Sequence, residues 1–242
     1  MEKQALFRFY AELNDLLPQS RRDVDVPVPL NNGDQSVKHL IESLGVPHTE
    51  VGQVRVNGAL VGFGYLVQEG DRVEVYPISS GAPSAQVVEI PRFILDNHLG
   101  RLAVYLRMLG FDTLYRNDFQ DDELAQVCNR EGRVLLTRDK RLLMRNLVTQ
   151  GYWLRSKIPR RQLEEVVGRF GLAGMIQPFQ RCVRCNEPLV PVRKEDILHR
   201  LEPLTRQYYD DFRLCPSCDQ IYWKGSHYER MRQIIEQVLR NV

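Results

Sequence analysis

The chain lacks any long apolar segment, since no run within its 242 residues approaches the roughly 18 residues needed to span a bilayer. The N-terminal stretch MEKQALFRFYAELNDLL also lacks the apolar core and cleavage site of a secretory signal. Cysteine is scarce: there are five, an odd number, and four of them stand in two close pairs. That pattern argues against a disulfide framework. These absences predict a cytoplasmic protein with no membrane partner.

The net charge of +2 conceals an asymmetry between two parts of the chain. Residues 1–80 hold 7 basic and 11 acidic side chains, a net charge of −4. Residues 81–242 hold 26 basic and 20 acidic side chains, a net charge of +6. A polyanionic partner is therefore expected to bind the later part.

Composition and pattern divide the chain into four stretches. Residues 79–86, SSGAPSAQ, are small, uncharged turn formers between two apolar patterns, which is typical of a linker. Near Gln180, alternating strand and helix patterns give way to cysteine pairs. We predict an N-terminal domain over 1–80, a linker over 81–90, a middle domain over 91–179 and a cysteine-rich domain over 180–242.

The first stretch predicts a small α+β domain with the order ββαββ. Strands are expected over residues 6–10, 24–28, 54–56 and 73–76, with a helix that Ser36 caps and Gly45 ends. The phrases VRVNG and LVQEGDRVEVYPI resemble ubiquitin-like (β-grasp) sulfur carriers, which act through a free C-terminal Gly-Gly. Here Ser79-Ser80-Gly81-Ala82 stands in that place and the chain continues. We therefore expect a docking or stabilising module with a protein partner, not a sulfur carrier.

The middle domain alternates strand and helix patterns. Strands are predicted over 93–95, 111–115, 134–136 and 152–154, with helices between and after them. The helix between the third and fourth strands is expected to include Leu142, Leu143 and Leu147. This βα alternation predicts an α/β fold with a parallel sheet, whose ligands sit at the carboxyl ends of the strands. No Gly-rich phosphate loop of either usual type is present.

Acidic residues stand at those carboxyl ends. Asp96 follows the first strand, Asp121 and Asp122 begin the second helix, and Asp139 follows the third strand. Carboxylates that converge repel one another unless a cation joins them, and hard oxygen ligands suit Mg²⁺ or Mn²⁺. The alternative is that each acid caps the helix that follows it.

Three stretches carry a family resemblance. FILDNHLGRLAVYLRMLGFDT, DDELAQVCNREGRVLLTRDKRLL and the cysteine-rich tail together resemble the PIN-like RNase domain named from the C-terminus of Mut-seven-type exonucleases. In bacteria a ubiquitin-like module often precedes that domain. The resemblance implies a metal-dependent ribonuclease whose ion is bound by Asp96, Asp121 and Asp139, with Asp122 as the competitor of Asp121. A fourth acid is common in PIN nucleases, but Lys140 and Arg141 follow Asp139 here. The sequence is therefore compatible with either one or two catalytic metal ions.

Basic residues surround the predicted site. Residues 130–161 contain ten Lys or Arg against Glu131 and Asp139 alone. Such a cluster is either a set of solvated helix faces or a track for an RNA backbone. The residues predicted to contact RNA are Arg138, Lys140 and Arg141, with Arg101 and Arg107 as weaker candidates.

The tail contains Cys182-x-x-Cys185 and Cys215-x-x-Cys218, with 29 residues between the pairs. This spacing predicts a zinc ribbon in which four thiolates close the coordination shell of a structural Zn²⁺. The 29-residue insert is expected to hold a short helix, and Met231, Ile235 and Val238 predict a closing amphipathic helix. Aromatic and cationic residues around the ribbon either stack on RNA bases or cover a thin core; they are Tyr208, Tyr209, Tyr222, Trp223, Lys224 and His227.

Together these patterns favour a metal-dependent ribonuclease acting on RNA, with tRNA and other structured RNAs among the candidate substrates. Two alternatives stay open at this point. One is a non-catalytic RNA-binding protein on the same fold, which the missing fourth acid favours. The other is a scaffold in RNA modification that works through the β-grasp module.

Overall fold

The computed structural model describes residues 3–31, 34–78 and 90–241, so all of the predicted linker except Ile90 lies outside the described residues. The chain forms two compact units. The first contains Met1–Ala82 and Asp121–Trp153, and the second contains Pro83–Gln120 and Leu154–Val242. Each unit is built from parts that are distant in sequence.

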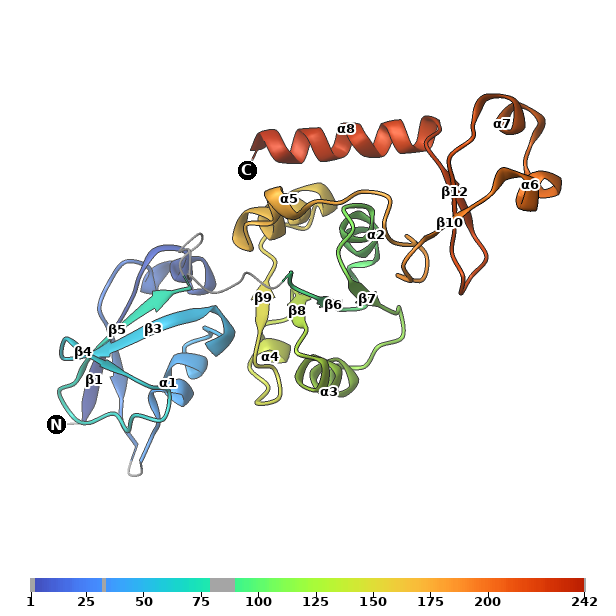
Figure 1. The fold of residues 1–242 in the computed structure, drawn as a ribbon. Coiled ribbons are helices and arrows are strands. Elements are labelled where there is room, and N and C mark those ends of the chain that lie inside the picture. The colour runs from blue at the N-terminus through green and yellow to red at the C-terminus, as the bar shows by residue number, and fades with distance from the viewer. Residues whose placement is uncertain (1–2, 32–33, 79–89, 242) are drawn as a thin grey trace. The chain divides into compact units, whose positions relative to one another are not determined.

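The N-terminal part of the first unit is a five-stranded sheet with one α-helix, α1 (Val37–Ser43) (Figure 1). Its strands, in the spatial order β2-β1-β5-β3-β4, are β1 (Gln4–Phe9), β2 (Val26–Pro29), β3 (Val51–Val56), β4 (Ala59–Val61) and β5 (Arg72–Pro77). The central pair β1 and β5 is parallel, and the other pairs are antiparallel. This arrangement is the predicted β-grasp domain.

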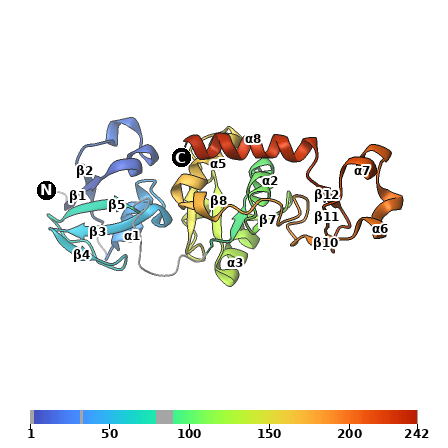
Figure 2. The ribbon, with the colours of Figure 1, turned by 45° about the horizontal axis from the view of Figure 1, so that its top comes forward.

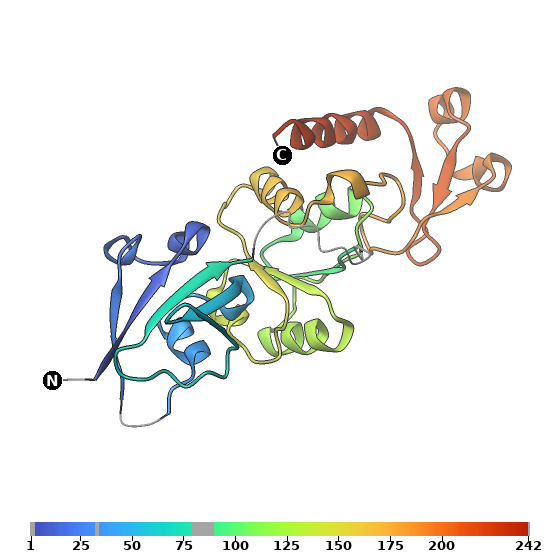
Figure 3. The same ribbon diagram turned by 60° about the vertical axis from the view of Figure 1, so that its left-hand side comes forward.

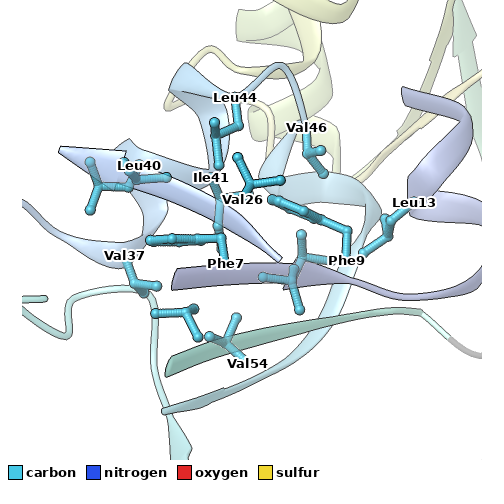
Figure 4. Close-up of a cluster of buried hydrophobic side chains, with 14 of the residues drawn as sticks. Phe7, Phe9, Leu13, Val26, Val37, Leu40, Ile41, Leu44, Val46 and Val54 are labelled. Atoms are coloured by element: carbon cyan, nitrogen blue, oxygen red, sulfur yellow. The ribbon is translucent and has the colours of Figure 1, made fainter. Parts of the chain in front are cut away.

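Alternating side chains build the core of the β-grasp domain. In β1, Ala5, Phe7 and Phe9 are buried while the residues between them are more exposed, the period expected of a half-buried strand. Figure 4 shows Phe7 and Phe9 together with Leu40 and Ile41 of α1 in this core. The Ser36 hydroxyl accepts a hydrogen bond from the His39 N–H at 3.3 Å, so the predicted helix cap is confirmed.

The structure contains one strand, β4, that the predicted order ββαββ lacks. Asn57 and Gly58 have φ values of 52° and 85°, the conformation of a tight hairpin turn, and the chain returns in β4 beside β3. Only three residues follow the turn in this strand, and Leu60 is 68% exposed. The sequence pattern missed β4 because a short exposed strand has no buried face to produce an alternation.

The middle domain contributes to both units. The first unit holds α3 (Asp121–Glu131), β8 (Val134–Thr137), α4 (Lys140–Leu143) and β9 (Gly151–Trp153). The second holds β6 (Phe93–Leu95), α2 (Gly100–Met108), β7 (Thr113–Tyr115) and α5 (Pro159–Arg169). The pair β6–β7 of the second unit is parallel, and so is the pair β8–β9 of the first unit.

The strands β6 and β8 are buried along their whole lengths, which is typical of strands covered on both faces. The predicted parallel α/β fold is therefore confirmed. One helix prediction was wrong in length: α4 ends at Leu143, and Leu147 lies beyond it with 45% exposure. Leu147 matched the helical spacing without lying on a buried helix face.

Within the first unit, polar contacts join the β-grasp domain to the segment from α4 to β9. The Glu50 carboxylate accepts the Trp153 N–H at 2.6 Å, and Glu50 is 1% exposed. His48 Nε2 lies 2.9 Å from the Val148 carbonyl oxygen. The Lys140 ammonium donates to the Leu16 carbonyl at 2.6 Å. Each contact pairs a side chain with a backbone group. Within the first unit, these contacts therefore fix the orientation of the β-grasp domain against the α4–β9 segment as well as its distance.

The second unit ends in the cysteine-rich domain. Its antiparallel sheet has the order β10-β11-β12 (Figure 3). The strands are β10 (Val190–Val192), β11 (Phe212–Leu214) and β12 (Ile221–Trp223), and the insert forms two short helices, α6 (Lys194–Ile197) and α7 (Pro203–Tyr208).

The closing helix α8 (Ser226–Asn241) packs on α5 (Figure 2). Its Met231, Ile235 and Val238 are buried, as their spacing predicts. Among the residues that the structure describes, no helix is both long and apolar enough to cross a membrane.

Candidate functional site

Asp139 stands at the junction of β8 and α4. Its Oδ1 accepts the Arg141 N–H at 2.7 Å, and its own N–H donates to Thr137 Oγ1 at 2.9 Å. Asp139 is therefore the N-cap of α4, the alternative that the sequence left open for it. The side chain is exposed, and a carboxylate offers about four lone-pair positions. One cap hydrogen bond leaves most of them available to another ligand.

Asp121 and Asp122 open α3 with exposed carboxylates, and Arg145 pairs with both. The Arg145 guanidinium makes a short contact with Asp122 Oδ1 and lies 3.8 Å from Asp121 Oδ2. Asp122 is thus the more closely held of the two acids. Arg145 was only one of ten basic residues in the sequence pattern, and nothing there indicated that it meets this acid pair.

Asp96 follows β6 and is half-buried. Its carbonyl oxygen accepts the Leu99 N–H at 3.0 Å, but α2 has no side-chain cap at its first turn. The N-cap position of α2 is therefore occupied by Leu99, and Asp96 precedes it by three residues. The neighbouring Asn97 Oδ1 is buried, and no hydrogen-bond donor reaches it in the described part of the chain. The sequence analysis did not single out Asn97.

The predicted RNA contacts differ in their surroundings. Arg101 and Arg141 are exposed. Arg138 is half-buried, and its Nε is buried without an acceptor among the described residues. Lys140 lies 4.7 Å from the centre of the Trp153 ring besides donating to Leu16. Its ammonium is therefore engaged in holding the β-grasp domain.

Arg107, one of the two weaker candidates, is 3% exposed and is a structural residue instead of an RNA contact. Its guanidinium donates to the Thr113 carbonyl at 2.9 Å and to the Val183 and Arg184 carbonyls at 3.2 and 2.9 Å. Burial lowers the pKa of this guanidinium from its usual value. Arg107 thus ties α2 and β7 to the first cysteine pair.

Asn186 reinforces the same connection. Its Oδ1 accepts the Thr113 N–H at 2.9 Å, and its Nδ2 donates to Asp112 Oδ1 at 2.8 Å. Its backbone φ of 74° lies in the left-handed region, which Asn tolerates well. One residue therefore completes the turn after Cys185 and joins that turn to the middle domain.

The four cysteines of the tail gather as predicted. Their sulfur atoms lie within 4.8 Å of one another, with Cys182 and Cys218 at 3.5 Å and Cys185 and Cys215 at 3.4 Å. All five cysteines of the chain are free thiols. Four thiolates around one zinc ion are expected about 3.8 Å apart, close to these distances. The cluster therefore fits a structural metal such as zinc.

The two cysteine pairs adopt the same turn. The Asn186 N–H donates to the Cys182 carbonyl at 2.9 Å, and the Asp219 N–H donates to the Cys215 carbonyl at 3.0 Å. Asp219, like Asn186, has a left-handed φ, at 58°. Two equivalent turns present two sulfur atoms each, which is the geometry of paired zinc knuckles.

In the described residues, the cysteine cluster is the single group of three or more metal-ligating side chains within 4.8 Å. Arg145 supplies the positive charge next to Asp121 and Asp122 in this structure.

Comparison with known proteins gives the family. The signature described as Mut7-C RNAse domain matches residues 91–235, more than half of the chain, and that described as Mut7-C ubiquitin matches residues 2–82. No curated protein matches. Among solved structures, the chain is similar to SAMP1 from Haloferax volcanii, with 20% identity and a TM-score of 0.26 over 33% of this chain and 99% of that chain. The family description indicates a nuclease-like function and RNA binding. The chain therefore belongs to the Mut7-C RNAse domain family and carries a Mut7-C ubiquitin domain ahead of its RNAse domain.

Proposed function

We propose that the chain is a metal-dependent ribonuclease that hydrolyses RNA phosphodiester bonds. The observation that carries this proposal is the set of acids at strand ends within a domain of the RNAse family. Asp96 follows β6 and Asp139 follows β8, and ligands of parallel α/β sheets bind where strands end.

Asp96, Asp121 and Asp139 are the residues that would hold the ion. Their carboxylate oxygens are hard ligands, so Mg²⁺ or Mn²⁺ fits them better than a thiophilic metal. Such an ion supplies activation of water and neutralisation of charge at phosphorus. Asp122 contributes less in this account, because Arg145 holds its carboxylate directly.

Arg138 supports the proposal through its unpaired Nε. A guanidinium N–H that is buried without an acceptor costs free energy, and a phosphate oxygen would satisfy it. Arg138 precedes Asp139 directly, so a phosphate bound by this group would lie beside the predicted metal ligand. Arg101 and Arg141 are exposed and remain available for neighbouring phosphates. Lys140 acts on the β-grasp side through Leu16.

The test compares Asp139→Asn with wild type on end-labelled tRNA and single-stranded RNA, with Mn²⁺, with Mg²⁺ or with neither. Asn caps helices about as well as Asp, so the substitution keeps the hydrogen bond to Arg141 and removes the charge. Wild type should cut only with added metal, and Asp139→Asn should lose activity by about 100-fold or more. The thermal midpoint should stay nearly unchanged.

A matched variant sharpens this test. Asp122→Asn removes a carboxylate from the same helix start, but one that Arg145 already holds. It should keep most of the activity, whereas Asp121→Asn should not. Equal cleavage by wild type and Asp139→Asn would mean that the site is wrong. Tight RNA retention without cleavage by any variant would favour the non-catalytic RNA-binding protein.

A further inference from the structure

An apolar cavity of about 290 Å³ lies in the second unit, between the first zinc knuckle, β12 and the start of α8. Its wall includes four aromatic side chains: Phe179, Tyr222, Trp223 and Tyr228. Phe179 meets Tyr222 and Tyr228 edge to face, with ring centres 6.5 and 5.5 Å away. The wall therefore presents flat ring surfaces, which favour a flat ligand.

The charged residues in the wall are both arginines. Arg181 is engaged by the protein, since it donates to the Asn186 carbonyl at 2.9 Å and lies 3.4 Å from Asp112 Oδ2. Arg184 is exposed, and its guanidinium donates to the neutral Gln220 side chain at 3.3 Å. Among the described residues, no carboxylate side chain lines the cavity. The mouth of the cavity therefore carries the positive charge of Arg184, which lies between the two cysteines of the first pair.

The first turn of α8 also lines the cavity, and its acidic residue, Glu229, is paired with Arg232 at 3.1 Å. Gly225 and Ser226 line the cavity, and α8 runs for 16 residues from Ser226. The N-terminal end of a helix of this length carries partial positive charge and N–H groups without partners inside the helix. A flat apolar interior next to an anion-attracting rim matches one chemical unit, a nucleobase with its phosphate.

The size of the cavity sets the number of bases. Pockets for drug-sized ligands run from about 300 to 1,000 Å³, so a cavity at the bottom of this range has room for a single base. Bases inside an RNA duplex are stacked and cannot enter such a space. The occupant must be unstacked, in a single strand, a loop or an end.

We propose that this cavity binds one unstacked base of an RNA strand, with Arg184 contacting the adjacent phosphate. The inference rests on the proposed function, because it takes RNA as the substrate. It also gives a role to two of the ribbon aromatics that the sequence left open, Tyr222 and Trp223. Trp223 packs against Phe212 at 6.4 Å and also lines the cavity, so it serves both the core and the ligand surface.

The two tryptophans of the chain make the proposal measurable. Trp153 lies in the first unit beneath Lys140, so Trp153→Phe leaves Trp223 as the sole tryptophan. Stacking of a base on or beside an indole quenches its fluorescence. The zinc-loaded full-length variant is titrated without Mg²⁺ or Mn²⁺, using a single-stranded oligoribonucleotide, an abasic oligomer of equal length and a blunt RNA duplex.

Quenching is expected with the single strand and not with the abasic oligomer or the duplex. In this background, Tyr228→Ala should weaken the binding about tenfold, because one stacked base contributes about 1–3 kcal/mol. Arg184→Ala should weaken it less and reduce its salt dependence by about one phosphate contact. Arg193→Ala is the matched control, since it removes an exposed arginine of the same ribbon that does not line the cavity.

Equal quenching by the abasic oligomer would overturn the proposal, because the cavity would then recognise the backbone alone. Binding of RNA with no response at Trp223, or equal loss with Arg193→Ala and Arg184→Ala, would overturn it too. Its failure is separable from that of the proposed function. If Asp139→Asn lost cleavage while the Trp223 fluorescence did not respond to RNA, the proposed nuclease function would stand and the base-binding cavity would be rejected.

Discussion

The two ends of the molecule are stabilised by different means. The β-grasp domain packs 19 buried hydrophobic residues into one cluster. The zinc ribbon has two small clusters, one with four buried residues around Phe212 and one with three around Cys182 and Cys215. Two of the three buried residues in the second cluster are themselves cysteines of the metal site. We therefore expect hydrophobic burial to suffice for folding at the first end, and a metal bound by the cysteine cluster to be needed at the second.

The two ends are also attached differently. The β-grasp domain contacts the α4–β9 segment through single side chains of Glu50, His48 and Lys140. The first zinc knuckle is joined to α2 and β7 by the buried Arg107 and by Asn186. Damage to the knuckle should therefore reach the RNAse domain, while damage inside the β-grasp core should stay more local.

Metal removal should produce the largest effect. A structural zinc site contributes about 10 kcal/mol or more to folding, and the ribbon has little else. Chelation, or Cys215→Ser, should expose the amides of β10–β12 to hydrogen exchange while β1 and β5 remain protected. Mass-spectrometric hydrogen exchange reads both regions in one sample. Protected ribbon amides in the metal-free protein would show that its small core suffices.

Cys128 is the matched control for metal removal. It lies buried on α3, its thiol donates to the Arg133 carbonyl at 3.0 Å, and burial raises its thiol pKa. Cys128→Ala should leave the zinc content unchanged. In wild type, thiol labelling after chelation should modify the four ribbon cysteines well before Cys128.

Core truncation should separate the two regions next. Phe7→Ala removes a fully buried ring from the β-grasp core and should cost about 3–5 kcal/mol of unfolding free energy. Phe212→Ala removes an equally buried ring from the ribbon, where the zinc should keep the fold together. Its cost should appear as weaker zinc retention in a chelator competition. If both variants lost the same unfolding free energy in denaturant and the same zinc retention against a chelator, the two ends would not differ in how they are stabilised.

Replacing Arg107 with Leu tests the joint between the ribbon and the RNAse domain. The change leaves the carbonyls of Thr113, Val183 and Arg184 without this donor and should cost about 3 kcal/mol. Zinc should also dissociate faster, because two of these carbonyls lie within the first knuckle. Arg101→Leu on the exposed face of α2 is the control. An unchanged zinc off-rate in Arg107→Leu would show that the joint does not support the knuckle.

Loss of the helix cap in the β-grasp domain should have the smallest effect. Ser36→Ala removes the acceptor of the His39 N–H and should cost about 1 kcal/mol in chemical denaturation. Ser36→Asp should restore most of that stability, since Asp is a strong N-cap. Zinc content should not change in either variant. A large loss of stability in Ser36→Ala would point to a role of Ser36 beyond the cap.

Local sequence patterns were enough to predict most of the fold. The alternation in β1, the cap at Ser36 and the two cysteine pairs each express a short-range rule, and the structure confirms all three. Arg107 shows the limit of such rules. Two of its acceptors lie 76 and 77 residues further along the chain, so no local pattern could distinguish it from a solvated helix residue.

The place of each candidate acid in the fold could be predicted from the sequence, whereas the partners of these acids could not. Each acid follows a strand or opens a helix, which sequence patterns reveal. The pairing of Arg145 with Asp121 and Asp122, and the unsatisfied atoms of Asn97 and Arg138, depend on tertiary packing. The same packing engages Lys140 at Leu16, so a basic residue beside an acid motif need not face the RNA.

We propose that one chain has two metal sites of different chemistry, a thiolate site in the ribbon and a carboxylate site in the RNAse domain. The most direct measurement is Mn²⁺ titration of the zinc-loaded protein by electron paramagnetic resonance, comparing wild type with Asp139→Asn. The account predicts that wild type binds Mn²⁺ and that Asp139→Asn loses this binding while keeping its zinc. Equal Mn²⁺ binding by both proteins, or none by wild type, would contradict the carboxylate site.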